Sequence, residues 1–146
     1  MTGAGRGPEE LVSGSARALG WSMPEVRKVL VVDDEPHILR SLGFILKRAG
    51  LEVLEARSGG EALEVARRER PELVFLDIMM PELDGYEVCR CIKTSKELAS
   101  TYVIMLTAKG EEADRQRGVA AGADEYMTKP FSPSRAVERV KAALNL

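Results

Sequence analysis

Short apolar runs alternate with longer amphipathic stretches along this chain from residue 28 onward. Continuous β-branched runs are typical of buried parallel strands, whereas apolar positions at helical spacing are typical of surface helices. The pattern therefore predicts strands at residues 28–32, 51–56, 73–76, 102–106 and 125–127. It predicts helices at residues 35–49, 58–70, 86–94, 111–121 and 132–144.

Capping and helix-ending residues support these boundaries. Gly50 and Gly122 follow the first and fourth predicted helices, where a left-handed residue commonly ends a helix. Ser58 and Glu61 have the spacing of a capping box at the start of the second helix. Pro133 lies in the first turn of the last helix, a position that proline favours.

The alternation of strands and helices predicts an α/β fold with one parallel sheet covered by helices on both faces, a three-layer sandwich. The first and third strands are the most apolar, so they should be central. The second strand is less apolar and should lie at an edge. This distribution favours the strand order 2-1-3-4-5.

The overall composition restricts the classes of function. The chain has 146 residues and a net charge of −2. This length fits a single domain with a sizeable core, and the charge does not support binding of nucleic acid through a basic face. No apolar run approaches the roughly 18 residues of a membrane span, and the N-terminus lacks a signal-peptide apolar region. We therefore expect a cytoplasmic protein with no membrane contact and no direct contact with nucleic acid.

Residues 1–27 differ from the rest of the chain because they are rich in Gly, Ser, Ala and Pro. Scattered apolar residues such as Leu19 and Trp21 form no strong stripe. We expect a flexible N-terminal extension here and a folded domain over residues 28–146. An alternative is that Trp21 belongs to a docking or capping segment.

Polar side chains follow four of the predicted strands at the point where each strand ends. They are Asp33 and Asp34 after the first strand, Asp77 after the third, Thr107 after the fourth and Lys129 after the fifth. In open α/β sheets the carboxyl ends of the strands form the ligand crevice, so these side chains should meet. Three carboxylates, a hydroxyl and an ammonium suggest a metal-assisted phosphoryl site on an aspartate.

The acidic pair Asp33-Asp34 argues for a bound cation. A nucleotide-binding fold would carry glycines in this loop, and bare carboxylates would repel a phosphate. A Mg²⁺ ion between the carboxylates and the phosphate removes this repulsion, because Mg²⁺ prefers oxygen ligands. The alternative is that Asp34 simply caps the following helix.

Asp77 ends the most buried predicted strand, where a lone charge is costly. It can act as a nucleophile that forms an aspartyl phosphate, or as a metal ligand or loop cap, and its place in the sheet does not decide between these roles. Thr107 can donate to a phosphoryl oxygen, and the small side chain of Ala108 leaves room for the group. Lys129 can neutralise phosphoryl oxygens or pair with Asp77, and its bond to Pro130 can adopt the cis form.

Four strings carry a resemblance to a known family: V-L-V-V-D-D-E-P, L-V-F-L-D-I-M-M-P-E-L-D-G-Y-E-V, V-I-M-L-T-A and G-A-D-E-Y-M-T-K-P-F. Found together and in this order, the four strings are highly specific for one protein family. From residue 28 to residue 144 the chain resembles the receiver domains of two-component response regulators. The resemblance implies a flavodoxin-like (βα)5 fold. No helix-turn-helix or catalytic pattern follows the last predicted helix, so we expect a single-domain response regulator or an excised receiver.

The resemblance implies a role for each residue of the site. Asp77 would be the phosphoacceptor and would receive a phosphoryl group from a sensor histidine kinase or a histidine phosphotransfer protein. Asp33, Asp34, Asp77 and the backbone carbonyl of Met79 would hold Mg²⁺. Thr107, Ala108 and Lys129 would contact the phosphoryl group. Such a protein would be a signalling switch rather than an enzyme.

Tyr126 matches the switch aromatic of the family, which turns inward when Thr107 moves toward the phosphate. The alternative is an ordinary half-exposed aromatic. The output surface would be formed by residues 111–121, 125–127 and 132–144, with charged residues at Glu111, Glu112, Arg115, Arg117 and Arg135. It would bind a downstream protein target, unless the phosphoryl group is passed onward, and its helices could pair in a homodimer. A solvated charged face is the alternative.

Met79 and Lys109 match the positions that modulate dephosphorylation in the family. Neither is an acid or carboxamide suited to orienting a water, so we expect slow self-dephosphorylation.

Three other functions remain open from the sequence. A haloacid-dehalogenase-type phosphatase would need a second aspartate where Met79 stands, and the acidic first loop argues against a flavin or nucleotide binder. A receiver-like protein that only binds partners is the third.

Overall fold

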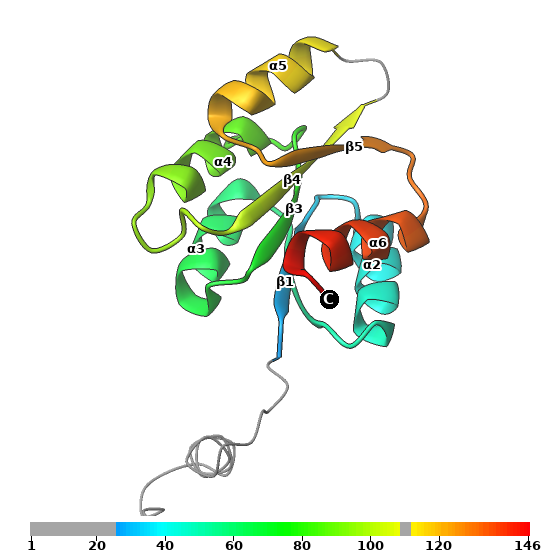
Figure 1. The fold of residues 1–146 in the computed structure, drawn as a ribbon. Coiled ribbons are helices and arrows are strands. Elements are labelled where there is room, and N and C mark those ends of the chain that lie inside the picture. Colours follow the sequence, from blue (N-terminus) through cyan, green and yellow to red (C-terminus); the bar gives the residue numbers. More distant parts are fainter. Residues whose placement is uncertain (1–25, 109–111) are drawn as a thin grey trace, which may run out of the picture.

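The computed structural model describes residues 26–108 and 112–146 (Figure 1). The predicted N-terminal extension therefore lies almost entirely outside the described residues. The elements are β1 (Lys28–Val32), α2 (Pro36–Arg48), β2 (Glu52–Ala56), α3 (Gly59–Glu69), β3 (Leu73–Asp77), α4 (Gly85–Thr94), β4 (Tyr102–Ala108), α5 (Glu112–Ala121), β5 (Glu125–Lys129) and α6 (Pro133–Leu144). Every predicted strand and helix is present.

The strands form one parallel sheet in the order β2-β1-β3-β4-β5, as predicted. Helices α2 and α6 lie on one side of the sheet and α3, α4 and α5 on the other (Figure 1). No helix in the described part of the chain is long and apolar enough to cross a membrane.

Two apolar cores lie on the two faces of this sheet. Side chains along β1 and β3 point alternately into one core and the other, and these central strands are almost wholly buried. Phe75 lies in the core beneath α2 and α6, whereas Leu76 lies in the core beneath α3 and α4. β2 has only one fully buried residue, Ala56, which confirms its edge position.

The helix ends follow the predicted signals with one difference. Ser58 Oγ accepts a hydrogen bond from the Glu61 amide at 3.2 Å. The Glu61 carboxylate, however, accepts from the amide of Arg57 at 2.7 Å rather than from that of Ser58. Gly50 and Gly122 adopt the left-handed backbone (φ 91° and 96°) that ends α2 and α5.

Three strands extend further than the sequence pattern indicates, and β3 does so by one residue, to Asp77. β4 continues to Ala108 and β5 to Lys129, with Thr107 paired to Thr128 and Ala108 to Lys129. The residues become polar here because the sheet edge faces the candidate site, while the backbone hydrogen bonding continues. Asp77, Thr107 and Lys129 therefore stand on strands, whereas Asp33 and Asp34 lie in the loop between β1 and α2.

Replacing Phe75, the largest fully buried side chain, tests the core beneath α2 and α6. We expect Phe75→Ala to lower the free energy of unfolding by about 3–5 kcal/mol, because it leaves a cavity. Phe44→Ala is the matched control, since Phe44 is 64% exposed, and we expect a change below about 0.5 kcal/mol. Urea unfolding measures both, and an equal loss in the two variants would contradict this description of the core.

Candidate functional site

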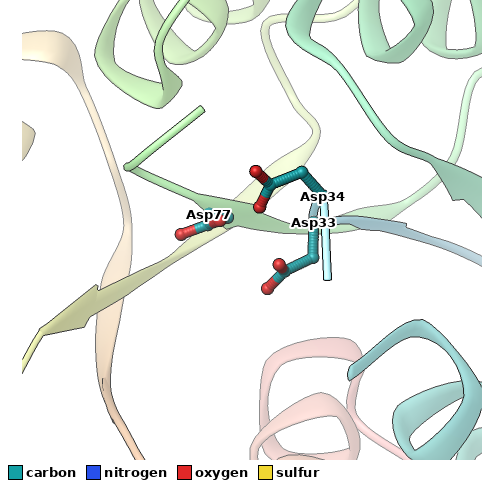
Figure 2. A group of neighbouring side chains, drawn as sticks. All are labelled: Asp33, Asp34 and Asp77. Atoms are coloured by element: carbon teal, nitrogen blue, oxygen red, sulfur yellow. The ribbon is translucent and has the colours of Figure 1, made fainter. Parts of the chain in front are cut away.

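The predicted site residues converge at the carboxyl edge of the sheet. Carboxylate oxygens of Asp33, Asp34 and Asp77 lie within 4.8 Å of one another, and Figure 2 shows these side chains gathered beside the ends of β1 and β3. Asp77, Thr107 and Lys129 line one cavity together with residues of α2 and of the segment after β5. The structure thus brings together the acids, the hydroxyl and the ammonium predicted from strand ends.

Asp33 is fully buried and makes two different contacts. Its Oδ1 accepts a hydrogen bond from the Glu35 amide at 3.0 Å, which supports the start of α2. Its Oδ2 lies 2.7 Å from Lys129 Nζ but accepts no hydrogen bond of normal geometry among the described residues. One oxygen of Asp33 thus fixes the loop and the other points to the site.

Asp34 does not cap the helix, so that alternative was wrong. The cap position of α2 is Glu35, whose side chain makes no capping hydrogen bond, and it is Asp33 that receives the Glu35 amide. The exposed Asp34 carboxylate remains directed to the cluster (Figure 2). The chain turns into α2 without using Asp34, which leaves its oxygens available to a cation.

Asp77 is 4% exposed at the end of β3, and its Oδ1 accepts a hydrogen bond from the Met79 amide at 3.3 Å. Burial, and then the charge of Asp33, raise the pKa of Asp77 from its usual 3.8 to about 7. Lys129, with Nζ 3.5 Å from Oδ1, opposes this rise. The Asp77 carboxylate is therefore held in a site that disfavours its charge.

Lys129 contacts three carboxylates at once. Its Nζ lies 2.7 Å from Asp33, 3.1 Å from Glu35 and 3.5 Å from Asp77. Burial alone would lower the pKa of Lys129, but these acids outweigh burial and raise it. The bond to Pro130 is cis, as the sequence allowed. Lys129 is thus a fully charged ammonium that is shared among the acids and lies nearest to Asp33.

Two further residues that line the cavity, Thr107 and Met79, differ in polarity. The Thr107 side chain is 6% exposed and lines the cavity, where its hydroxyl can donate. Ala108 follows it at the end of β4, opposite Lys129. The Met79 side chain is 73% exposed at the cavity and offers no polar atom.

Two residues that contribute to the site were missed by the sequence analysis. Glu35 forms an ion pair with Lys129. The sequence shows that Glu35 is acidic, but it does not show that this side chain contacts β5. Gly85 packs on the backbone of Asp77 and Ile78: a Cβ there would lie 2.8 Å from Ile78 Cα and closer still to the Asp77 carbonyl oxygen. In the sequence, an Asp-Gly pair such as Asp84-Gly85 is typical of a turn, but it does not show the close approach to β3. Gly85 therefore lets the start of α4 approach the strand that carries Asp77.

The predicted output residues are partly described. Tyr126 is half-buried on β5 and packs against the core beneath α3, α4 and α5. Arg117 and Arg135 are exposed. Lys109 and Glu111 lie outside the described residues, as do the side chains of Glu112 and Arg115.

The donor set fits a hard divalent cation. Among the described residues this is the one cluster of three or more acidic, His or Cys side chains that could hold a metal ion. It combines three carboxylates, an Asp33 oxygen without a normal hydrogen bond, and a single nearby ammonium, so it keeps a net negative charge. Oxygen ligands of this kind suit Mg²⁺.

Comparison with known proteins identifies the family. Residues 29–141 match the sequence model described as the response regulator receiver domain. The chain belongs to this family. It is therefore a receiver domain, the phosphorylation-activated module of two-component signalling, as the resemblance implied.

Two relatives from Bacillus subtilis illustrate the similarity of this receiver. It is 49% identical over 118 residues to the alkaline phosphatase synthesis transcriptional regulatory protein PhoP, covering 81% of this chain and 48% of PhoP. It is 50% identical over 117 residues to the transcriptional regulatory protein ResD, covering 80% of this chain and 48% of ResD. The chain thus spans about half the length of these curated relatives.

Solved structures share the fold of this receiver. A response regulator from Chloroflexus aurantiacus is 34% identical, with a TM-score of 0.79, covering 84% of this chain and all of that one. The response regulator DrrB of Thermotoga maritima is 37% identical, with a TM-score of 0.75, covering 83% of this chain and 54% of that one. The flavodoxin-like prediction is confirmed, and the family disfavours the phosphatase and nucleotide-binding alternatives.

The raised pKa of Asp77 predicts how stability depends on pH without metal. The folded receiver binds this proton more tightly than the unfolded chain, so its stability falls as pH rises from about 4 to about 7. Asp77→Asn removes the carboxylate, and we expect it to raise the free energy of unfolding by about 1–3 kcal/mol at pH 8 and to change it little at pH 4.

Urea unfolding in the presence of a chelator measures this effect. Glu64→Gln is the control, because the Glu64 side chain is 76% exposed, and its effect should stay within about 0.5 kcal/mol at both pH values. A lower stability of Asp77→Asn than of the wild type at pH 8 would contradict the charge argument.

Proposed function

We propose that Asp77 is the phosphoacceptor of this receiver and that it takes its phosphoryl group from a sensor histidine kinase or a histidine phosphotransfer protein. The supporting observation is the place of Asp77: it is a buried carboxylate at the open end of β3, next to the carboxylates of Asp33 and Asp34, and it lines one cavity with the Thr107 hydroxyl and the Lys129 ammonium. Among the acids of this cluster, the Asp33 carboxylate already accepts a hydrogen bond from the Glu35 amide at the start of α2 and forms an ion pair with Lys129.

The proposed transfer is a displacement at phosphorus. A carboxylate oxygen of Asp77 forms the new bond to phosphorus while the bond from phosphorus to the histidine nitrogen breaks. The imidazole leaves with that electron pair and is protonated from solvent, and Asp77 becomes a mixed carboxylic–phosphoric anhydride. The pKa near 7 means that the nucleophilic, deprotonated form is available around neutral pH.

We propose that Asp33, Asp34, Asp77 and the Met79 carbonyl hold Mg²⁺. Bound there, Mg²⁺ would neutralise charge on the phosphoryl oxygens and on the carboxylates around it. Lys129 would exchange Asp33 and Glu35 for a phosphoryl oxygen, since its ammonium is already 3.5 Å from Asp77. The Thr107 hydroxyl would donate to another phosphoryl oxygen, and Ala108, the next residue of β4, would contact the phosphoryl group.

The proposed output is a shift of the surface formed by α5, β5 and α6. New contacts of the phosphoryl group with Thr107 and Lys129 favour one of two conformations, and Tyr126 follows Thr107 inward. The shifted surface binds a protein target, which includes a second copy of this chain, or the phosphoryl group passes onward. We place this function in the cytoplasm.

Intact mass after incubation with acetyl phosphate and Mg²⁺ tests the phosphoacceptor. We expect wild type to gain one phosphoryl group, because acetyl phosphate is a reactive acyl phosphate: the Asp77 carboxylate forms the new bond to phosphorus while acetate leaves with the electrons of the old one. Asp77→Asn should gain none, and a chelator should abolish the gain in wild type. No gain in folded wild-type protein under any condition would favour a receiver that only binds partners.

The exposed, apolar Met79 side chain predicts a long-lived phosphoryl group. It cannot orient a water for attack on the anhydride, so we expect the phosphorylated form to persist for minutes or longer after removal of acetyl phosphate. Met79→Asn should shorten this lifetime roughly tenfold, the effect of about 1.4 kcal/mol from one added hydrogen bond. Mass spectrometry at increasing times measures this lifetime. Loss of the phosphoryl group from the wild type within seconds would refute the expectation.

A further inference from the structure

Residues 116–121 are the part of helix α5 whose side chains the structure describes. In residues 116–121, only Gly118 and Ala121 are buried. The Arg117 guanidinium lies over the ring of Tyr86, 4.1 Å from its centroid, and Cys89 Sγ donates to the Ala121 carbonyl at 3.4 Å. These contacts fix α5 against α4 at residues on both sides of Gly118.

Gly118 is in direct contact with the ring of Tyr126. A Cβ atom at position 118 would lie 2.6 Å from Tyr126 Cζ and closer still to its hydroxyl oxygen. Carbon atoms not bonded to each other approach only to about 3.5 Å at their optimum. The observed orientation of Tyr126 therefore requires a residue without a side chain at position 118.

A methyl group at position 118 would move the ring rather than the helix. Tyr126 is a half-buried side chain that can rotate about its own bonds, whereas α5 is fixed by the Arg117–Tyr86 and Cys89–Ala121 contacts. The Gly118–Tyr126 contact thus selects the ring orientation that the structure shows.

We propose that Gly118 is a positioning residue that holds Tyr126 in its resting orientation and thereby sets how readily Asp77 is phosphorylated. This rests on the proposed function, in which Tyr126 changes orientation on phosphorylation. A group that stabilises only the resting conformation opposes phosphorylation by the same amount, because the coupling between the two is reciprocal. Loss of the contact raises the population of the competent conformation.

A double-mutant cycle in thermal unfolding tests the contact itself. Alanine favours helices over glycine, so Gly→Ala raises the melting temperature where nothing obstructs the methyl group. Gly60→Ala in α3 is the matched control, because a Cβ there meets no atom within 4 Å. We expect Gly118→Ala to lower the melting temperature in wild type but to raise it in the Tyr126→Ala background. Equal increases in the two backgrounds would overturn the proposal.

The rate of phosphorylation by acetyl phosphate with Mg²⁺ tests the consequence for the switch. We expect Gly118→Ala to gain phosphate about three- to tenfold faster than wild type, since the competent fraction limits the apparent rate. In the Tyr126→Ala background the same substitution should change the rate less than about 1.5-fold, and Gly60→Ala should match wild type. An unchanged rate in Gly118→Ala, or an equal acceleration in both backgrounds, would overturn the proposal.

The two experiments separate this inference from the proposed function. If wild type gains no phosphate while the unfolding cycle shows the expected reversal, the proposed function fails, and with it the link to Asp77, but the contact stands. If wild type is phosphorylated and the cycle shows no reversal, the proposed function stands and the role of Gly118 is refuted.

Discussion

Repulsion among Asp33, Asp34 and Asp77 is the constraint on which the rest of the site depends. Three carboxylates lie within 4.8 Å of one another, two of them buried, with one ammonium between them. Such a group opposes folding unless charge is neutralised, and Lys129 does this only in part. The stability of the domain must come from elsewhere, namely from the two apolar cores on the faces of the sheet. The same repulsion makes the site attractive to a divalent cation and to a phosphoryl group accompanied by that cation.

The register of the sheet fixes the relative positions of the charged side chains that strands β3 and β5 carry. Asp77 is paired with Leu106 and Ala108 with Lys129, so the register of β3, β4 and β5 fixes which residues share the open edge. Because β3, β4 and β5 continue into the site, Asp77, Thr107 and Lys129 are held by the backbone hydrogen bonds of the sheet as well as by side-chain contacts. Gly85 adds the last constraint, since a larger residue would push α4 away from the backbone that carries Asp77.

The sequence predicted those features of the fold and the site that follow from hydrophobic periodicity and from the positions of polar residues at strand ends. Strand order followed from the apolar character of β1 and β3, and the meeting of Asp33, Asp77 and Lys129 followed from strand ends in a parallel sheet. The sequence could not show that Asp33 rather than Asp34 supports the start of α2, because one bond rotation decides which carboxylate faces the amide. It could not show the Glu35–Lys129 ion pair, since that distance depends on how two loops pack.

The contact between Gly118 and Tyr126 was beyond sequence reasoning for a related reason. From the sequence alone, a glycine in a helix indicates only a lower helix propensity. The reason for a glycine at position 118 becomes visible only with the Tyr126 ring, which approaches from β5. In residues 116–121 of α5 only Gly118 and Ala121 are buried, while Asp77 lies in a strand that is buried along its whole length. The ring of Tyr126 is half-buried, so it can change orientation more easily than the wholly buried strand that carries Asp77. Stability thus resides in the central strands, and the contact between Gly118 of α5 and Tyr126 of β5 is where we propose that the domain responds to phosphorylation.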